Sequence, residues 1–160
     1  MLAESSTRTD SEEVVSKLMS EAINFHFSID GDDFTSAGKA SVQVKKLLRQ
    51  LNFDSDTIRR VSVAMYEGEI NMVIHANGGV ADVNVWDDRI EVVLADSGPG
   101  IPDIDLAMQE GFSTAKDNIR SLGFGAGMGL PNMKRYSDEM DISSEVGKGT
   151  TVTMRFAVGG

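Results

Sequence analysis

Cysteine is absent from this chain of 160 residues, so disulfides, thiolate metal ligands and cysteine nucleophiles are excluded. No apolar run approaches the roughly 18 residues of a membrane-spanning helix. The first residues, MLAESSTRTDSEE, lack the basic and apolar regions of a secretory signal. These absences predict a cytoplasmic protein with no membrane-embedded part.

Positive charge is also scarce. Lys and Arg number 15 against 25 Asp and Glu, which gives a net charge of −10. Such a chain repels nucleic acid and anionic membranes at long range, so we expect neither as a partner. A basic protein surface is the better electrostatic match. An anionic ligand would need local help from backbone N–H groups, helix N-termini or a cation.

The hydrophobic share of 41% indicates a globular chain, and 160 residues is the usual length of one domain. Residues 1–22 are predicted to form a polar tail with a short helix, and residues 23–160 the domain. Because the strands are joined by short turns, we expect a two-layer α/β sandwich. Its sheet should be mixed and mostly antiparallel, with helices on one face. Periodicity predicts strands at 24–29, 80–85, 90–95, 140–145 and 150–158, and helices at 36–51, 57–76, 104–108 and 130–137.

The first candidate for chemistry is Glu67-Gly-Glu-Ile-Asn71, within the predicted helix 57–76. Positions i and i+4 share a helix face, so Glu67 and Asn71 should point the same way. An amide oxygen is a hard ligand that suits Mg²⁺. A carboxylate one turn away can deprotonate a hydroxyl. A solvated helix face explains the same residues without any function.

Two glycine-containing segments follow. Asp96-Ser-Gly-Pro-Gly100 comes directly after an apolar strand, where a carboxylate can accept a hydrogen bond from an exocyclic amine. Gly123-Phe-Gly-Ala-Gly-Met-Gly129 precedes a predicted helix, and its backbone N–H groups can surround phosphates. An ordinary turn is the alternative for the first segment, and a flexible linker for the second.

In this order, the segments resemble the motifs of the GHKL ATPases, which include gyrase-type ATPases, Hsp90, histidine kinases and MutL. The resemblance spans about residues 24–158. The sequences around SGPGIPDIDLAM and GLPNMKRYSDEM are similar to anti-sigma regulatory Ser/Thr kinases, the stressosome switch kinases being the nearest type. Glu67 to Asn71 resembles the N box, Asp96 to Gly100 the G1 box, Gly125 to Gly129 the G2 box, and Gly147 to Thr150 the later G-x-G-T segment.

The resemblance implies the Bergerat ATP-binding fold, with ATP and Mg²⁺ as ligands. Asn71 would coordinate Mg²⁺, and Glu67 would act as the general base. Asp96 would accept a hydrogen bond from the adenine amino group, supported by Thr150. Residues 110–128 would form a lid over the nucleotide. The glycines that would shape the adenine pocket and the phosphate loop are Gly98, Gly100, Gly125, Gly127 and Gly129.

Gly68 departs from the usual N box, which often has Ala at this position. Glycine costs about 1 kcal/mol inside a helix, so we attribute it to close packing or to closer approach of a ligand. For His75 we predict support of the helix end rather than catalysis.

The implied function is phosphoryl transfer from ATP to a Ser or Thr of a STAS-type antagonist protein. One alternative is an anti-sigma factor, or another nucleotide-dependent binding switch, that holds its partner without kinase activity. Another is a detached catalytic domain that phosphorylates a histidine of a partner. Members of the family often form homodimers, but no apolar stripe in this sequence predicts one.

Overall fold

The computed structural model describes residues 21–32, 37–109 and 129–159. The predicted lid at 110–128 and most of the predicted tail lie outside these residues, so the domain boundary at residue 22 stays a prediction. Among the described residues, none of the helices is both long and apolar enough to cross a bilayer. The elements are β1 (Ile23–Asp30), α3 (Lys39–Gln50), α4 (Ser55–Ala76), β2 (Gly78–Val85), β3 (Arg89–Ala95), α5 (Ile104–Ala107), α7 (Gly129–Tyr136), β4 (Glu139–Glu145) and β5 (Gly149–Ala157).

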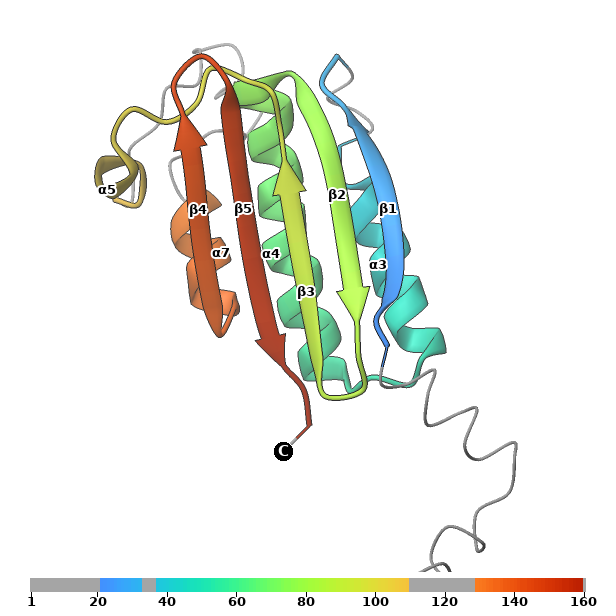
Figure 1. Cartoon of the computed structure of the whole chain (residues 1–160). Helices are drawn as coiled ribbons and strands as arrows, with labels where there is room; N and C mark the ends of the chain where they lie inside the picture. The colour runs from blue at the N-terminus through green and yellow to red at the C-terminus, as the bar shows by residue number, and fades with distance from the viewer. Residues whose placement is uncertain (1–20, 33–36, 110–128, 160) are drawn as a thin grey trace, which may run out of the picture.

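The strands form one sheet in the order β1-β2-β3-β5-β4. Each of the four neighbouring pairs is antiparallel, so the sheet is purely antiparallel in the described residues rather than mixed. Helices α3, α4 and α7 all cover the same face of this sheet (Figure 1). The predicted two-layer architecture is therefore confirmed.

Alternation along the strands explains which face the helices cover. In β5, Val152, Met154 and Phe156 are buried, while the residues between them are partly exposed. In β2, Ala81 and Val83 are buried in the same way. Since successive strand side chains point to opposite faces, the apolar set packs under the helices and the polar set faces solvent.

Helix α4 is the central helix of this layer. Its N-cap is Asp54, which accepts hydrogen bonds from the Thr57 N–H at 3.1 Å and from Thr57 Oγ1 at 2.6 Å. It ends at Asn77, whose φ of 58° is left-handed. Helix α3 begins three residues later than predicted, because Gly38 has a left-handed φ of 97°.

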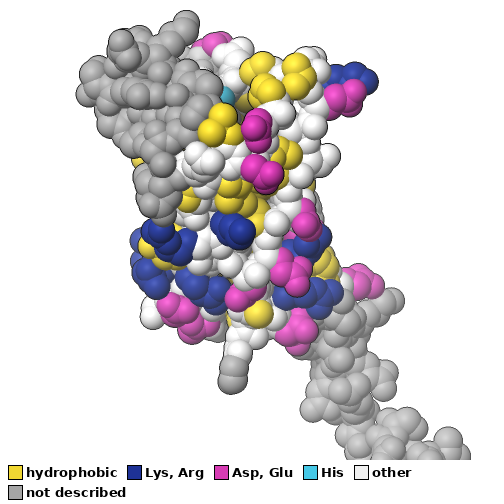
Figure 2. All heavy atoms as spheres, turned by 90° about the vertical axis from the view of Figure 1, so that its left-hand side faces the viewer, with side chains coloured by type: hydrophobic (Ala, Val, Ile, Leu, Met, Phe, Trp, Pro, Cys, Tyr) yellow, Lys and Arg dark blue, Asp and Glu magenta, His cyan; other side chains and the backbone are white. Residues whose placement is uncertain are grey.

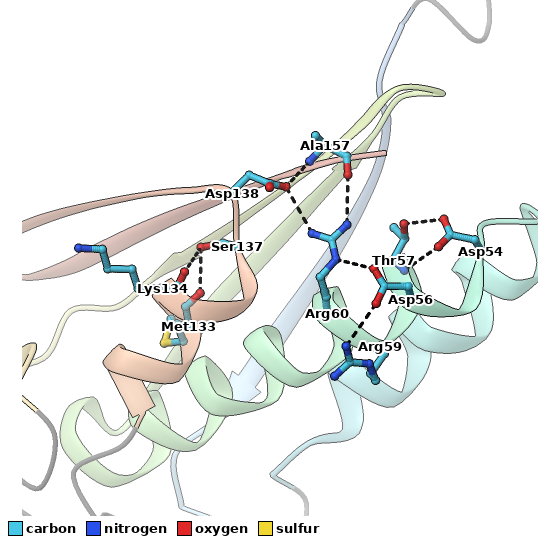
Figure 3. Close-up of polar contacts among 10 residues, drawn as sticks. All are labelled: Asp54, Asp56, Thr57, Arg59, Arg60, Met133, Lys134, Ser137, Asp138 and Ala157. Atoms are coloured by element: carbon cyan, nitrogen blue, oxygen red, sulfur yellow. Dashed lines mark hydrogen bonds and ion pairs between the residues drawn. The ribbon is translucent and has the colours of Figure 1, made fainter. Parts of the chain in front are cut away.

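A hydrogen-bonded group at the start of α4 fixes the helix layer to the end of the sheet. Arg60 donates to Asp56 at 3.1 Å, to Asp138 at 3.3 Å and to the Ala157 carbonyl at 3.2 Å (Figure 3). Asp138 lies between α7 and β4 and also accepts from the Ala157 N–H at 2.7 Å. This group holds the C-terminal end of α7 beside the first turns of α4. The first residue of α7, Gly129, lies farther along α4, beside Asn71.

Candidate functional site

The side chains of Glu67 and Asn71 meet the same partner helix, α7. Asn132 Nδ2 donates to Glu67 Oε1 at 3.4 Å, and Asn71 Nδ2 donates to Met133 Sδ at 3.9 Å. The expectation that residues 67 and 71 share a face is confirmed by these contacts. Two adjacent residues of α7 therefore hold the two polar side chains of α4.

The Glu67 carboxylate is half-buried, and this burial raises its pKa above the usual range for Glu. The hydrogen bond from Asn132 opposes this effect, since it stabilises the charged form. A carboxylate with a raised pKa is a better proton acceptor when ionised. The chemistry that Glu67 can perform is therefore general-base catalysis on a hydroxyl.

The side chain of Asn71 lies against the first residue of α7. A Cβ on Gly129 would stand 2.6 Å from Asn71 Nδ2 and 2.7 Å from Oδ1, so any side chain there would displace the amide. Among the described residues, Oδ1 of Asn71 has no hydrogen-bond partner. An unpaired, half-buried amide oxygen fits a hard cation such as Mg²⁺.

Asp96 stands where β3 leaves the sheet. Its Oδ1 accepts from the Gly98 N–H at 2.9 Å and from the Thr150 N–H at 3.1 Å. Its own N–H donates to the Thr150 carbonyl at 2.9 Å. Within the described chain, Oδ2 of Asp96 has no partner, which leaves one fixed acceptor free. This oxygen fits the exocyclic amine of adenine.

Glycine is required in the loop that follows Asp96. A Cβ on Gly98 would come within 2.6 Å of the Ala76 Cβ, at the end of α4. Gly100 has a left-handed φ of 79°, and a Cβ there would meet the Glu145 carbonyl oxygen at 2.5 Å. The loop therefore packs closely between the end of α4 and the β4–β5 turn.

Ser144 belongs to this site, although no sequence motif includes it. Its Oγ lies 2.8 Å from Thr150 Oγ1 and accepts from the Ile101 N–H at 2.7 Å. Thr150 supports Asp96 through its backbone, while its hydroxyl contacts Ser144. Two consecutive serines in a short strand carry no chemical pattern, so only the pairing of β4 with β5, which sets Ser144 opposite Thr150, could identify it.

Glu69 is a second residue missed from the sequence. Its side chain is 2% exposed. Its carboxylate accepts from three backbone N–H groups at the start of α3, those of Gly38 at 3.0 Å, Ala40 at 3.2 Å and Ser41 at 2.6 Å. Burial raises the pKa of Glu69, and these hydrogen bonds oppose the shift. Glu69 thus anchors α3 to the helix that bears Glu67 and Asn71.

The close-packing explanation for Gly68 agrees with the structure. A Cβ there would overlap Leu94 Cδ1 and stand 3.1 Å from Met133 Cε. Burial lowers the pKa of His75 near the helix end, because it disfavours the charged imidazolium.

A cavity of about 600 Å³ opens at the C-terminal end of α4. It is lined by Gly31, Asp32, residues 73–77 and residues 97–99, and Glu67, Asn71 and Asp96 do not line it. Gly125 and Gly127 lie outside the described residues, so their assignment to the phosphates stays a prediction.

Comparisons with known proteins show which family the chain is similar to. Residues 7–159 match the family described as histidine kinase-, DNA gyrase B-, and HSP90-like ATPase. The chain is 32% identical over 112 residues to the serine/threonine-protein kinase RsbT of Bacillus subtilis, covering 68% of this chain and 78% of RsbT. It is 35% identical over 124 residues to the anti-sigma F factor of Geobacillus stearothermophilus, covering 74% of this chain and 82% of that factor.

Two solved structures share the fold. The RsbU and RsbW domains of a Mycobacterium tuberculosis protein align with a TM-score of 0.59 and 18% identity, over 85% of this chain and 32% of that one. The SiaB–SiaC complex from Pseudomonas aeruginosa aligns with a TM-score of 0.53 and 11% identity, over 95% of this chain and 99% of that one. At these identities the likeness concerns the fold alone. Because the family match covers nearly the whole chain, the chain belongs to the histidine kinase-, DNA gyrase B- and HSP90-like (GHKL) ATPase family.

Proposed function

We propose that this chain is a protein serine/threonine kinase that transfers a phosphoryl group from ATP to a STAS-type antagonist partner. The observation that carries the proposal is the pair on α4. Glu67 is a half-buried carboxylate held by Asn132, and Asn71 presents an unpaired amide oxygen one turn away. A base and a cation ligand on one helix face suit transfer to a hydroxyl.

In this proposal each residue has one task. Asn71 Oδ1 would hold Mg²⁺, and Asp96 Oδ2 would accept a hydrogen bond from the adenine amine. When bound, MgATP supplies an activated phosphoryl group. Glu67 takes the proton from the attacking Ser or Thr hydroxyl, and burial of its carboxylate keeps the base reactive. Gly98 and Gly100 let the loop after Asp96 pack against α4 and the β4–β5 turn. Gly129 leaves the Asn71 amide in place.

Two relatives support complementary parts of this proposal. RsbT is named a serine/threonine-protein kinase, which favours phosphoryl transfer. The other relative is named an anti-sigma F factor, which favours a stable regulatory complex. Either activity depends on cytoplasmic ATP, so we propose that the protein acts in the cytoplasm.

The test is transfer of labelled phosphate from ATP to purified STAS-domain proteins of the source genome. Glu67→Ala should abolish transfer while binding of a fluorescent ATP analogue is retained. Asp96→Ala should weaken that binding. Transfer that persists at the wild-type rate in Glu67→Ala would rule out the base. Acid-labile phosphoprotein would instead indicate transfer to histidine.

A second candidate function is a nucleotide-controlled binding switch. The anti-sigma F name of a relative favours it. A sigma factor that is retained by the immobilised chain only with ATP, with no phosphate transferred to any STAS protein, would favour this function over the kinase. Light scattering of the purified chain would test whether it forms the homodimer that is common in the family.

A further inference from the structure

Helix α3 is basic in an acidic protein. Its 12 residues include Lys39, Lys45, Lys46 and Arg49 and no acidic residue, whereas the whole chain carries a net charge of −10. These four side chains and Val42 are exposed. Val42, Lys46 and Arg49 lie three, seven and ten positions after Lys39, so they share its helix face, and Lys45 lies beside them. Together the five residues form a continuous surface, which we call the α3 face.

The cations of the α3 face have no ionic partner in the described part of the chain. Within the described ranges, none of the four lies within ion-pair distance of a carboxylate, and Lys134 is the other lysine or arginine without a described interaction. By contrast, Arg60 and Arg155 each contact more than one carboxylate. Figure 2 shows basic and acidic side chains intermixed on the side of the molecule that bears β4 and α7.

Unpaired charge on α3 works against the helix itself. Lys45 and Arg49 are four residues apart, and like charges at this spacing destabilise a helix. Leu48 and Val44 on the opposite side are fully buried, so packing holds the helix in place despite the repulsion. Val42 is 52% exposed at the centre of the face, which makes it apolar as well as basic.

The α3 face is also rigidly connected to the candidate active site. Glu69 accepts hydrogen bonds from the N–H groups of Gly38, Ala40 and Ser41. It stands two residues from both Glu67 and Asn71 on α4. A partner bound to α3 is therefore held in a set position relative to these two side chains, without any ordering of the helix on binding.

We propose that the α3 face is the docking surface for an acidic patch of the protein partner, with Val42 as its apolar contact and the four cations pairing with carboxylates. A protein is favoured over nucleic acid or an anionic membrane. Those polyanions are extended and would also meet the remaining surface, which is strongly acidic, whereas a small acidic patch contacts the basic helix alone. The inference rests on the proposed function for the identity of the partner.

The experiment compares two double variants of the full chain that change net charge equally. Lys45→Gln/Lys46→Gln removes two cations from the α3 face. Arg59→Gln/Lys134→Gln removes two cations from exposed positions of α4 and α7 instead. All four positions are exposed helix positions, and Lys, Arg and Gln have similar helix propensities, so both variants should fold, as thermal melts will check.

Calorimetry with each purified STAS-domain protein of the source genome measures the dissociation constants. We expect Lys45→Gln/Lys46→Gln to weaken binding about tenfold or more at low salt, and Arg59→Gln/Lys134→Gln to change it less than about threefold. Raising NaCl to about 0.5 M should remove most of the difference, since exposed charges are then screened. Equal affinity of the two variants overturns the proposal, as does failure of every STAS protein to bind.

Two parallel measurements separate this inference from the kinase proposal. Lysine-dependent binding without phosphate transfer keeps the docking surface and removes the kinase. Transfer with an unchanged KM in Lys45→Gln/Lys46→Gln keeps the kinase and removes the docking surface. Vesicles of phosphatidylcholine and phosphatidylserine and a duplex DNA serve as the other probes. Lysine-dependent binding to either of them, with none to a STAS protein, would assign the α3 face to a polyanion and overturn the proposal.

Discussion

Asn132 on α7 donates a hydrogen bond to the carboxylate of Glu67 on α4, with 3.4 Å between Nδ2 and Oε1. The contact joins residues 65 positions apart in the sequence. It connects the helix that follows the second glycine segment to the proposed base. The position of α7 therefore governs how Glu67 is oriented.

Asn132→Ala should lower the rate of phosphoryl transfer with little change in ATP affinity. If the lost hydrogen bond costs about 1 kcal/mol of transition-state stabilisation, kcat should fall about fivefold. Because the Asn132 hydrogen bond lowers the pKa of Glu67, its removal should also shift the acidic limb of the kcat–pH profile upward. Lys134→Ala, on the exposed side of α7, is the matched control. An unshifted limb with unchanged kcat would show that Asn132 does not position the base.

Gly129→Ala should weaken Mg²⁺-dependent nucleotide binding. The added Cβ would stand 2.7 Å from Asn71 Oδ1, so the amide must turn away from the cation. We expect affinity for the nucleotide with Mg²⁺ to fall about tenfold, the equivalent of one lost metal contact, and affinity without Mg²⁺ to change less. Titration of a fluorescent ATP analogue measures both. If Asn71→Ala and Gly129→Ala act on the same ligand, the double variant should be no weaker than Asn71→Ala alone.

Glu67→Gln should stabilise the fold at neutral pH. The folded-state pKa of Glu67 is raised, so the folded chain binds more protons than the unfolded chain between the two pKa values. The stabilising contribution of Glu67 to the free energy of unfolding is therefore fully present below its pKa in the unfolded chain. This contribution is lost as the pH rises through the pKa of Glu67 in the folded chain. Glutamine is neutral throughout. Urea unfolding should show the variant more stable than wild type at pH 7, and the gap should close below about pH 4. A pH-independent difference would contradict this origin.

Glu69→Ala should be strongly destabilising. It leaves three buried N–H groups at the start of α3 without an acceptor, and we expect a loss of about 3 kcal/mol in the free energy of unfolding. Glu69→Gln keeps one acceptor oxygen and the side-chain volume, so its loss should be about half as large. Urea denaturation gives both values. Equal losses for the two variants would contradict this account, because the acceptor oxygen that glutamine keeps would then contribute nothing to the stability.

Local patterns in the sequence identified most of the fold. The alternation in residues 80–85 and 90–95 predicted the β2–β3 hairpin, and the spacing of apolar residues predicted α4 to its last residue. The start of α3 was misplaced because the left-handed conformation of Gly38 depends on packing against Tyr66 and on the Glu69 carboxylate.

The residues of the candidate site also fall into two groups, those that the sequence identified and those that only the structure revealed. Glu67, Asn71 and Asp96 could be singled out because each belongs to a short segment whose spacing carries chemical meaning. Asn132, Ser144 and Glu69 could not, since each acts on a residue from a distant part of the chain. Periodicity and turn chemistry are properties of neighbouring residues, so the sequence alone determined the elements and the motif side chains. Which atoms meet across those elements depends on the packing of α4 between α3 and α7, so only the tertiary structure decided it.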